Sequence, residues 1–279
     1  MSADTSYLAP AKLNLMLRVT GRRADGYHLL QTVFRFIDYS DTLRFALRDD
    51  GVIARMNDVP GVSVDEDLTL RAARLLQRAG ATRFGADITL EKRLPLGGGL
   101  GGGSSDAATA LIALNRLWAL NWPRARLQEL ALELGADVPV FVFGKSAEGR
   151  GVGEQLRPLE LPPAWYLVLM PPVRVATARI FQDPDLIRDS IPIKIPPFSV
   201  TLGLNDFEPV VCRLYPEVAR QLAWLKQFGV ASMTGSGACV FAEFGTEAAA
   251  HAVLPQLPAT MRGIVARGLN RHPLWPLCV

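Results

Sequence analysis

The sequence contains few of the residues that build metal centres. Its 279 residues include three cysteines and three histidines, each far from the others along the chain, and no C-x-x-C pair. A zinc cluster therefore has almost no support, because its ligands ordinarily come in closely spaced pairs. An odd and sparse cysteine count is typical of a reducing compartment, and we expect a cytoplasmic location.

Long apolar runs and blocks of like charge are also missing. No uninterrupted apolar stretch approaches the length that spans a bilayer, and the first residues, with Asp4 and no apolar core, lack the pattern of a secretory signal. Lys and Arg outnumber Asp and Glu by 30 to 27, and five basic residues never occur in a row. We therefore expect no membrane partner and no nucleic-acid partner. Nothing in the sequence indicates an oligomeric state.

The composition is that of a folded protein with a sizeable core, since 49% of the residues are hydrophobic and 20% are charged. The length suits two domains of ordinary size, and Pro158, Pro162 and Pro163 mark the candidate linker. We predict domains over residues 1–158 and 159–279. Because strands and helices do not alternate strictly, the predicted fold class is α+β.

Local patterns predict the elements within these domains. Leu13, Leu15 and Leu17 alternate with mostly polar residues, which predicts a half-buried strand over 11–19 with Lys12 and Asn14 on its polar face. The residues ADVPVFVFG, 136–144, are interpreted as a turn into a buried strand. Further strands are expected at 31–37, 42–47, 52–56, 86–91, 165–170, 238–244 and 264–268, and helices at 67–79, 124–134, 205–212, 216–228 and 246–257.

The strongest local feature is the segment PLGGGLGGGSSDAATALIALNRLWAL, residues 95–120. Six glycines among residues 97–103 lead into an apolar-faced helix whose start is marked by Ser104, Ser105 and Asp106. A glycine backbone can approach a phosphate closely, because no Cβ intervenes. A helix N-terminus adds free N–H groups and the positive end of the helix dipole. The segment therefore predicts a phosphate-binding loop rather than a flexible linker.

The best-known phosphate loops do not fit this segment. Gly97, Gly99 and Gly102 match the dinucleotide spacing, but the next acidic residue after Asp106 is Glu129, which lies in a predicted helix instead of at the end of a strand. A P-loop ending at Gly144-Lys145-Ser146 would have Pro139 in place of its first glycine, and proline has no N–H to donate. The protein-kinase motifs H-R-D and D-F-G are absent.

Four blocks of sequence together resemble one enzyme superfamily. The segment PLGGGLGGGSSDAA is similar to the second motif of the GHMP kinases, which phosphorylate small alcohols. Three further blocks resemble the same superfamily: PAKLNLMLRVTGRRADGYHLLQT (10–32), LGADVPVFVFG (134–144) and MTGSGACVFAEF (233–244). The element GRRADGYH within the first of these is specific to the branch that acts on a cytidine-diphospho sugar alcohol in the non-mevalonate isoprenoid pathway.

The resemblance implies a ribosomal protein S5 domain 2-like N-terminal domain, a ferredoxin-like C-terminal domain, and an acceptor bound between them. It implies ATP and Mg²⁺ as cofactors, Asp137 as the base, and Lys12 as the residue that orients the acceptor's 2-hydroxyl group. The loop residues that it assigns to ATP are Pro95, Leu96, Gly97, Gly98, Gly99, Leu100, Gly101, Gly102, Gly103, Ser104 and Ser105. Those that it assigns to the acceptor are Asn14, Tyr27, His28, Thr177 and Phe181, with Tyr27 and His28 at the cytosine. No carboxylate pair is dedicated to the metal, so Mg²⁺ would be held largely by phosphates and water.

Each of these residues also has an ordinary interpretation. A lysine on a strand is usually solvated, Asp137 could serve in a turn or cap, and Ser104 could only cap its helix. Residues 146–153, SAEGRGVG, depart from the family pattern at Glu148 and Arg150. Two alternative functions stay open at this stage: a kinase for a homoserine- or mevalonate-type alcohol, and a non-catalytic nucleotide- or RNA-binding module with an S5-like fold.

Overall fold

The computed structural model describes residues 5–196 and 203–277, so Asp4 and Cys278 lie outside it. The described strands are β1 (Ser6–Arg22), β2 (His28–Arg48), β3 (Ile53–Arg55), β4 (Gly85–Glu91), β5 (Ala147–Arg150), β6 (Gln155–Pro158), β7 (Trp165–Leu169), β8 (Ala231–Met233), β9 (Val240–Phe244) and β10 (Gly263–Leu269). They form one sheet in the order β3-β4-β2-β10-β7-β9-β8, and β1 and β5 both pair with β2, while β6 pairs with β5.

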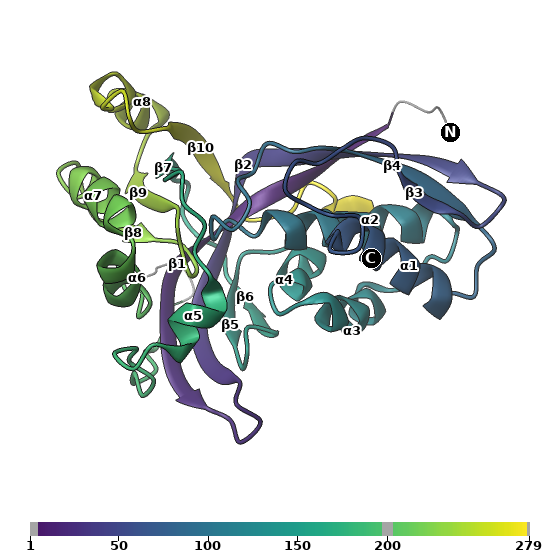
Figure 1. Ribbon diagram of the computed structural model, residues 1–279, viewed down its shortest axis with the longest axis horizontal. Coiled ribbons are helices and arrows are strands. Elements are labelled where there is room, and N and C mark those ends of the chain that lie inside the picture. The colour runs from purple at the N-terminus through teal and green to yellow at the C-terminus, as the bar shows by residue number, and fades with distance from the viewer. Residues whose placement is uncertain (1–4, 197–202, 278–279) are drawn as a thin grey trace.

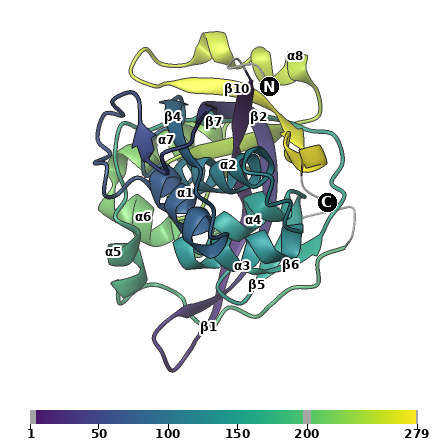
Figure 2. The same cartoon turned by 90° about the vertical axis from the view of Figure 1, so that its right-hand side faces the viewer.

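The helices gather in two groups, one on each side of the long β1–β2 hairpin (Figures 1 and 2). The first group is α1 (Leu68–Ala79), α2 (Gly102–Leu117), α3 (Arg124–Leu134) and α4 (Val138–Phe143). The second is α5 (Thr177–Gln182), α6 (Glu208–Leu214), α7 (Pro216–Leu225) and α8 (Glu247–His251). Short 3₁₀ turns follow at Leu254–Gln256 and Trp275–Leu277. None of the described helices has the length and apolarity to cross a bilayer.

Several predicted elements are confirmed. Helix α1 begins where expected, because the Asp67 side chain accepts a hydrogen bond from the Thr69 N–H and caps the first turn. Helix α3 has the predicted bounds. The predicted helix at 246–257 is instead two short pieces, α8 and the 3₁₀ turn at Leu254–Gln256, because Pro255 within the second piece has no N–H with which to continue an α-helix. The short elements β5, β6, β8 and α5 were not predicted.

The strand predicted at 11–19 is part of the much longer β1, and it is not half-buried. Lys12 and Asn14 are each only 2% exposed. The polar face of the strand is covered by the glycine loop, which lies against Lys12, and by the segment 234–235, which lies against Asn14. The alternation in sequence therefore did not mark a solvent-facing side. One end of the hairpin, with Tyr7, packs in the core beneath α1–α4, and the other end, with Leu17, packs in the core of the second helix group.

The residues predicted as a turn and strand at 136–144 form the helix α4 instead. Pro139 lies in the first helical turn, where its missing N–H interrupts no hydrogen bond. The apolar run is buried all around, and such a run is compatible with either a strand or a buried helix. The predicted start of α2 was also wrong. This helix begins at Gly102 after an N-cap at Gly101, so Ser104 and Ser105 do not cap it.

The predicted domain boundary falls at the end of β6. The sheet continues across this point, since β10 pairs with β2 through Gly268 and Leu269. Residues after β10 return to the first helix group, where Trp275 lies against Arg124. The division at residue 158 stays a prediction.

Candidate active site

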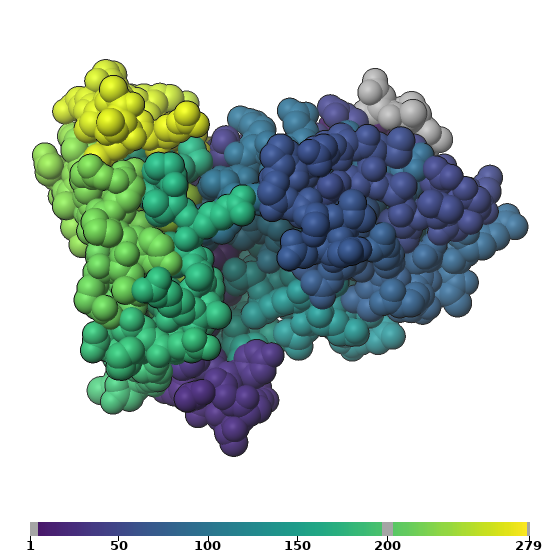
Figure 3. Space-filling model, in the orientation of Figure 1, coloured from purple at the N-terminus to yellow at the C-terminus, as the bar shows by residue number. Residues whose placement is uncertain are grey.

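Two cavities open between the two helix groups, where the surface is hollowed (Figure 3). The larger, of about 700 Å³, is lined by the β1–β2 hairpin and α5. The smaller, of about 360 Å³, is lined by the glycine loop. Four residues line both cavities: Ser104, Asp137, Thr177 and Ser236. A group bound in one cavity can therefore reach a group bound in the other at this junction.

The glycine loop forms a wall of the smaller cavity. Of the residues assigned to ATP, all line this cavity except Leu100 and Ser105, which are buried beneath it. The Ser105 hydroxyl donates to the Pro10 carbonyl at 2.7 Å and so ties the helix to β1. The first turn of α2 carries no acidic residue that would repel a phosphate.

Glycine is required at position 99 by backbone contact. Its φ is +77°, and a Cβ there would lie 2.2 Å from the carbonyl oxygen of Thr234. No L-residue fits without displacing one of the two loops. The predicted phosphate loop is therefore packed directly against the segment 233–239.

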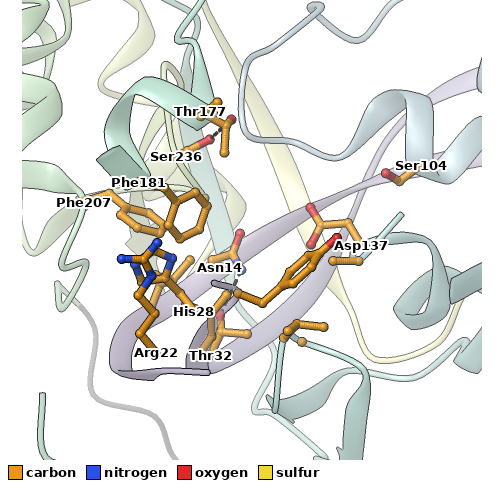
Figure 4. Close-up of a pocket in the computed structure, with 18 of the residues that line it drawn as sticks. Asn14, Arg22, His28, Thr32, Ser104, Asp137, Thr177, Phe181, Phe207 and Ser236 are labelled. Carbon is orange, nitrogen blue, oxygen red and sulfur yellow. Dashed lines mark hydrogen bonds between the residues drawn. The ribbon is translucent and has the colours of Figure 1, made fainter. Parts of the chain in front are cut away.

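Lys12 and Asp137 lie together at the cavity junction. The Lys12 Nζ is 3.3 Å from the Asp137 Oδ2 and donates to the Asn14 Oδ1 at 2.5 Å. Asp137 is the N-cap residue of α4, but its side chain makes no capping hydrogen bond and is 42% exposed. The carboxylate is thus directed into the cavity, as Figure 4 shows, and does not cap the first turn of α4.

Asn14 connects three segments of the site. Its side-chain amide donates to the Thr32 hydroxyl at 2.8 Å, and its backbone N–H donates to the Thr234 hydroxyl at 3.0 Å. The Thr234 hydroxyl also donates to the Gly99 carbonyl at 3.2 Å. We did not predict Thr32 or Thr234 as site residues, although they lie in the recognised blocks 10–32 and 233–244.

The four other residues assigned to the acceptor all line the larger cavity. The His28 ring stacks on Phe181 with centroids 4.8 Å apart, and Tyr27 beside it is 64% exposed. Thr177 shares a 2.6 Å hydrogen bond with Ser236 at the junction of the two cavities (Figure 4). Phe207, which packs edge-on against Phe181, and Ser236 were not predicted.

A buried ion cluster lies beside the glycine loop, and two of its members, Lys92 and Asp106, line the smaller cavity. The Lys92 Nζ donates to Asp41 at 2.5 Å and to Asp106 at 2.6 Å. One oxygen of Asp106, Oδ1, has no hydrogen-bond partner. Burial, with the nearby Asp41 charge, raises the pKa of Asp106 to about 8 despite the opposing effect of Lys92.

Replacing Asp106 by Asn is expected to leave the fold intact and to make stability less dependent on pH. The native carboxyl holds its proton to higher pH than the unfolded one, whose pKa is about 4. Its contribution to the free energy of unfolding therefore falls as pH rises from about 4 to about 8. Asn keeps the shape and does not ionise, so the variant should gain stability relative to the wild type across this range. Urea unfolding at pH 5 and pH 8 measures the free energy of unfolding of both proteins. The same difference between variant and wild type at both pH values would contradict the prediction.

Glu148, where the sequence departs from the family pattern, lies outside both cavity linings. It is 2% exposed and accepts hydrogen bonds from Gln31, Arg150 and Arg157 at 2.6–2.9 Å. Burial opposes ionisation, but these donors hold the pKa of Glu148 below its ordinary value. The departure is therefore a structural ion cluster and does not alter the described cavity wall.

Replacing Glu148 by Ala should lower the free energy of unfolding by about 2 kcal/mol at pH 7, because Gln31 and two partly exposed arginines lose their acceptor. A carboxylate with a lowered pKa contributes its stability above the unfolded value and loses it as pH falls through the folded value. The difference should therefore disappear below about pH 4. The control is Glu129→Ala, which removes a surface pair with Arg126 and should cost under about 1 kcal/mol. Equal losses in both variants would contradict the prediction.

Family models described as "GHMP kinases N terminal domain" and "GHMP kinases C terminal" match residues 67–145 and 198–263. A 4-diphosphocytidyl-2-C-methyl-D-erythritol kinase of Nitrosospira multiformis is 62% identical, covering 98% of this chain and 94% of the relative. The protein of that name from Thiobacillus denitrificans is 64% identical, covering 97% of each chain.

Solved structures agree with this assignment. A crystal structure of 4-(cytidine 5'-diphospho)-2C-methyl-D-erythritol kinase matches with a TM-score of 0.80 and 36% identity, covering 95% of this chain and 99% of that one. A homoserine kinase from Cytophaga hutchinsonii shares the fold, with a TM-score of 0.67 and 16% identity. The predicted α+β GHMP kinase fold is thereby confirmed. With this identity across nearly its full length, the chain belongs to the 4-diphosphocytidyl-2-C-methyl-D-erythritol kinase family of the GHMP kinases.

Proposed function

We propose that this chain transfers the γ-phosphoryl group of ATP to the 2-hydroxyl group of 4-diphosphocytidyl-2-C-methyl-D-erythritol, in the non-mevalonate isoprenoid pathway. The observation that carries the proposal is the contact between Lys12 and Asp137 at the junction of the two cavities. ATP would lie in the smaller cavity, along the glycine loop, and the acceptor in the larger one. The acceptor hydroxyl and the terminal phosphate would then meet beside Asp137.

The proposed roles follow from the chemistry of phosphoryl transfer, which depends on alignment and charge stabilisation. Asp137 would accept the hydroxyl proton, because its carboxylate is directed into the cavity and makes no capping hydrogen bond to α4. Lys12, buried and held by Asn14, would orient that carboxylate and donate to the reacting oxygen. Backbone N–H groups of the loop and of the first turn of α2 would hold the phosphates.

Mg²⁺ is part of the proposal as a companion of ATP. Among residues 5–196 and 203–277, no cluster of three or more His, Cys, Asp or Glu side chains could form a metal cage. The junction offers oxygen donors of the type that Mg²⁺ prefers, among them the Asp137 carboxylate and the Ser104 hydroxyl. The metal would therefore be held mainly by phosphate oxygens and water, with these two groups beside it, and would neutralise charge on the phosphates.

At the acceptor end, Tyr27 and His28 would bind the cytosine, with Phe181 stacked on the His28 ring. Thr177 would contact the acceptor near the cavity junction, where it lies with Ser236.

The direct test is ATP consumption by the purified chain with a panel of alcohols: the cytidine-diphospho compound, homoserine and mevalonate. We expect turnover with the first alone, and phosphate on its 2-hydroxyl by ³¹P NMR. Turnover with homoserine or mevalonate instead would favour another acceptor within the superfamily. ATP binding with no turnover on any alcohol would favour the non-catalytic nucleotide-binding module.

A further inference from the structure

Arg188 contacts His28, one of the proposed base-binding residues, from outside the lining of the larger cavity. Three of its hydrogen bonds go to backbone carbonyls around the end of α5: Phe181 at 2.9 Å, Asp183 at 2.7 Å and Leu186 at 2.9 Å. The fourth runs from its Nε to the His28 Nε2 at 3.3 Å. The planar guanidinium is therefore fixed by its surroundings before it reaches His28.

This contact determines where the His28 ring carries its hydrogen. A guanidinium has five N–H donors and no acceptor, so the His28 Nε2 must accept. In the neutral ring, the hydrogen must then be on Nδ1. Burial, followed by the charges of Arg188 and Arg22, lowers the pKa of His28, which keeps the ring neutral at physiological pH. The nearby carboxylate of Asp25 is paired with Arg23 at 2.7 Å.

We propose that Arg188 is a positioning residue that fixes His28 as the Nδ1–H tautomer, so that the larger cavity selects a cytosine base over a uracil base. The inference rests on the proposed function, because it requires that a pyrimidine base bind beside His28.

The selectivity follows from hydrogen-bond polarity. An Nδ1–H ring offers the base a donor and no acceptor. Cytosine presents acceptors at N3 and O2, whereas uracil presents a donor at N3. Two donors that face each other leave both unpaired, and a partly buried unpaired group costs about 1–3 kcal/mol. A site built around one hydrogen-bond pattern therefore rejects the opposite pattern.

The tautomer can be measured without any ligand. The chain has only three histidines, so ¹⁵N-histidine labelling gives a simple spectrum, and His28→Gln identifies the signal. We expect a protonated Nδ1 and an unprotonated Nε2 for His28 in the wild type at pH 7.5. An Nε2–H signal there would overturn the proposal without any further variant.

Two arginine variants separate the hydrogen bond from the charge. Arg188→Met removes both, and we expect the His28 Nε2–H form to become the major tautomer. Arg22→Met removes a charge that also lowers the His28 pKa but makes no hydrogen bond to the ring, so the pKa should rise while the tautomer stays Nδ1–H. An unchanged tautomer in Arg188→Met would overturn the proposal. Arg188→Lys, which keeps a donor and the charge, should keep the wild-type tautomer and is the variant to use if Arg188→Met does not fold.

The functional consequence is a ratio of kcat/KM values for the cytidine-diphospho acceptor and its uridine-diphospho counterpart. We expect Arg188→Met to reduce this ratio at least tenfold, and Arg22→Met to leave it within about twofold. An equal ratio in wild type and Arg188→Met would refute the selectivity role. If the wild type turns over neither compound, the proposed function fails, while the tautomer measurement still decides the role of Arg188.

Discussion

Replacing Asp137 by Asn is expected to lower kcat by about 10²–10⁴-fold, the usual contribution of a positioned general base. The amide has nearly the same shape as the carboxylate but cannot accept the proton of the acceptor hydroxyl. Because Asp137 makes no capping hydrogen bond and is 42% exposed, the fold and the affinity for ATP should change little. Single-turnover kinetics measures the transfer step, and calorimetric titration with a non-hydrolysable ATP analogue measures the affinity.

The matched control for this substitution is Asp185→Asn. Asp185 is 70% exposed and pairs with Arg213 on the surface, away from both cavity linings. The change of charge is the same, and we expect kcat within about twofold of the wild type, as is usual for surface pairs. Wild-type turnover by the Asp137→Asn protein would refute the assignment of the base.

Replacing Gly99 by Ala should weaken the affinity for the nucleotide by about 100-fold or more. The added Cβ would lie 2.2 Å from the Thr234 carbonyl oxygen, in a backbone conformation with φ of +77° that L-residues rarely adopt. The glycine loop or the segment 233–239 must therefore move, and either movement disrupts the hydrogen bonds that join Asn14, Thr234 and Gly99. Thermal unfolding with and without ATP reports both the stability and the remaining affinity.

Gly97→Ala is the control, because it adds the backbone strain of a positive φ without the steric collision that a Cβ at Gly99 would cause. Gly97 also has a positive φ, of +67°, but its added Cβ would only touch the Arg174 side chain, at 3.8 Å. The left-handed conformation alone should lower the free energy of unfolding of this variant by about 1–2 kcal/mol. If Gly97→Ala and Gly99→Ala lose nucleotide affinity equally, the contact between the glycine loop and the segment 233–239 does not position the glycine loop for nucleotide binding.

The chemistry-bearing residues could be predicted from sequence because each belongs to a short, recognisable block. Six glycines in seven residues before a helix indicate an anion site by local backbone physics alone, since both the missing Cβ atoms and the free N–H groups are local properties. Lys12, Asp137 and His28 were found only through the resemblance of their blocks to a superfamily. By itself, each residue has an ordinary surface interpretation.

The tertiary structure decided which of these residues meet. Periodicity placed Lys12 on a polar strand face, but the glycine loop and the segment 234–235 bury that face. Solvent exposure depends on what packs against a strand, which its own periodicity does not record. The apolar run at 138–143 fits a strand and a buried helix equally well, and surrounding contacts selected the helix.

The sequence by itself predicted a phosphate loop and was enough to determine an α+β fold and the sequence blocks of a kinase superfamily. Only the folded chain brought Thr234 to Gly99, Arg188 to His28 and Lys12 to Asp137, across separations of 125 residues or more. Hydrogen bonds between residues so distant in the chain leave no periodic trace in sequence, because their geometry depends on how the whole sheet closes around the β1–β2 hairpin.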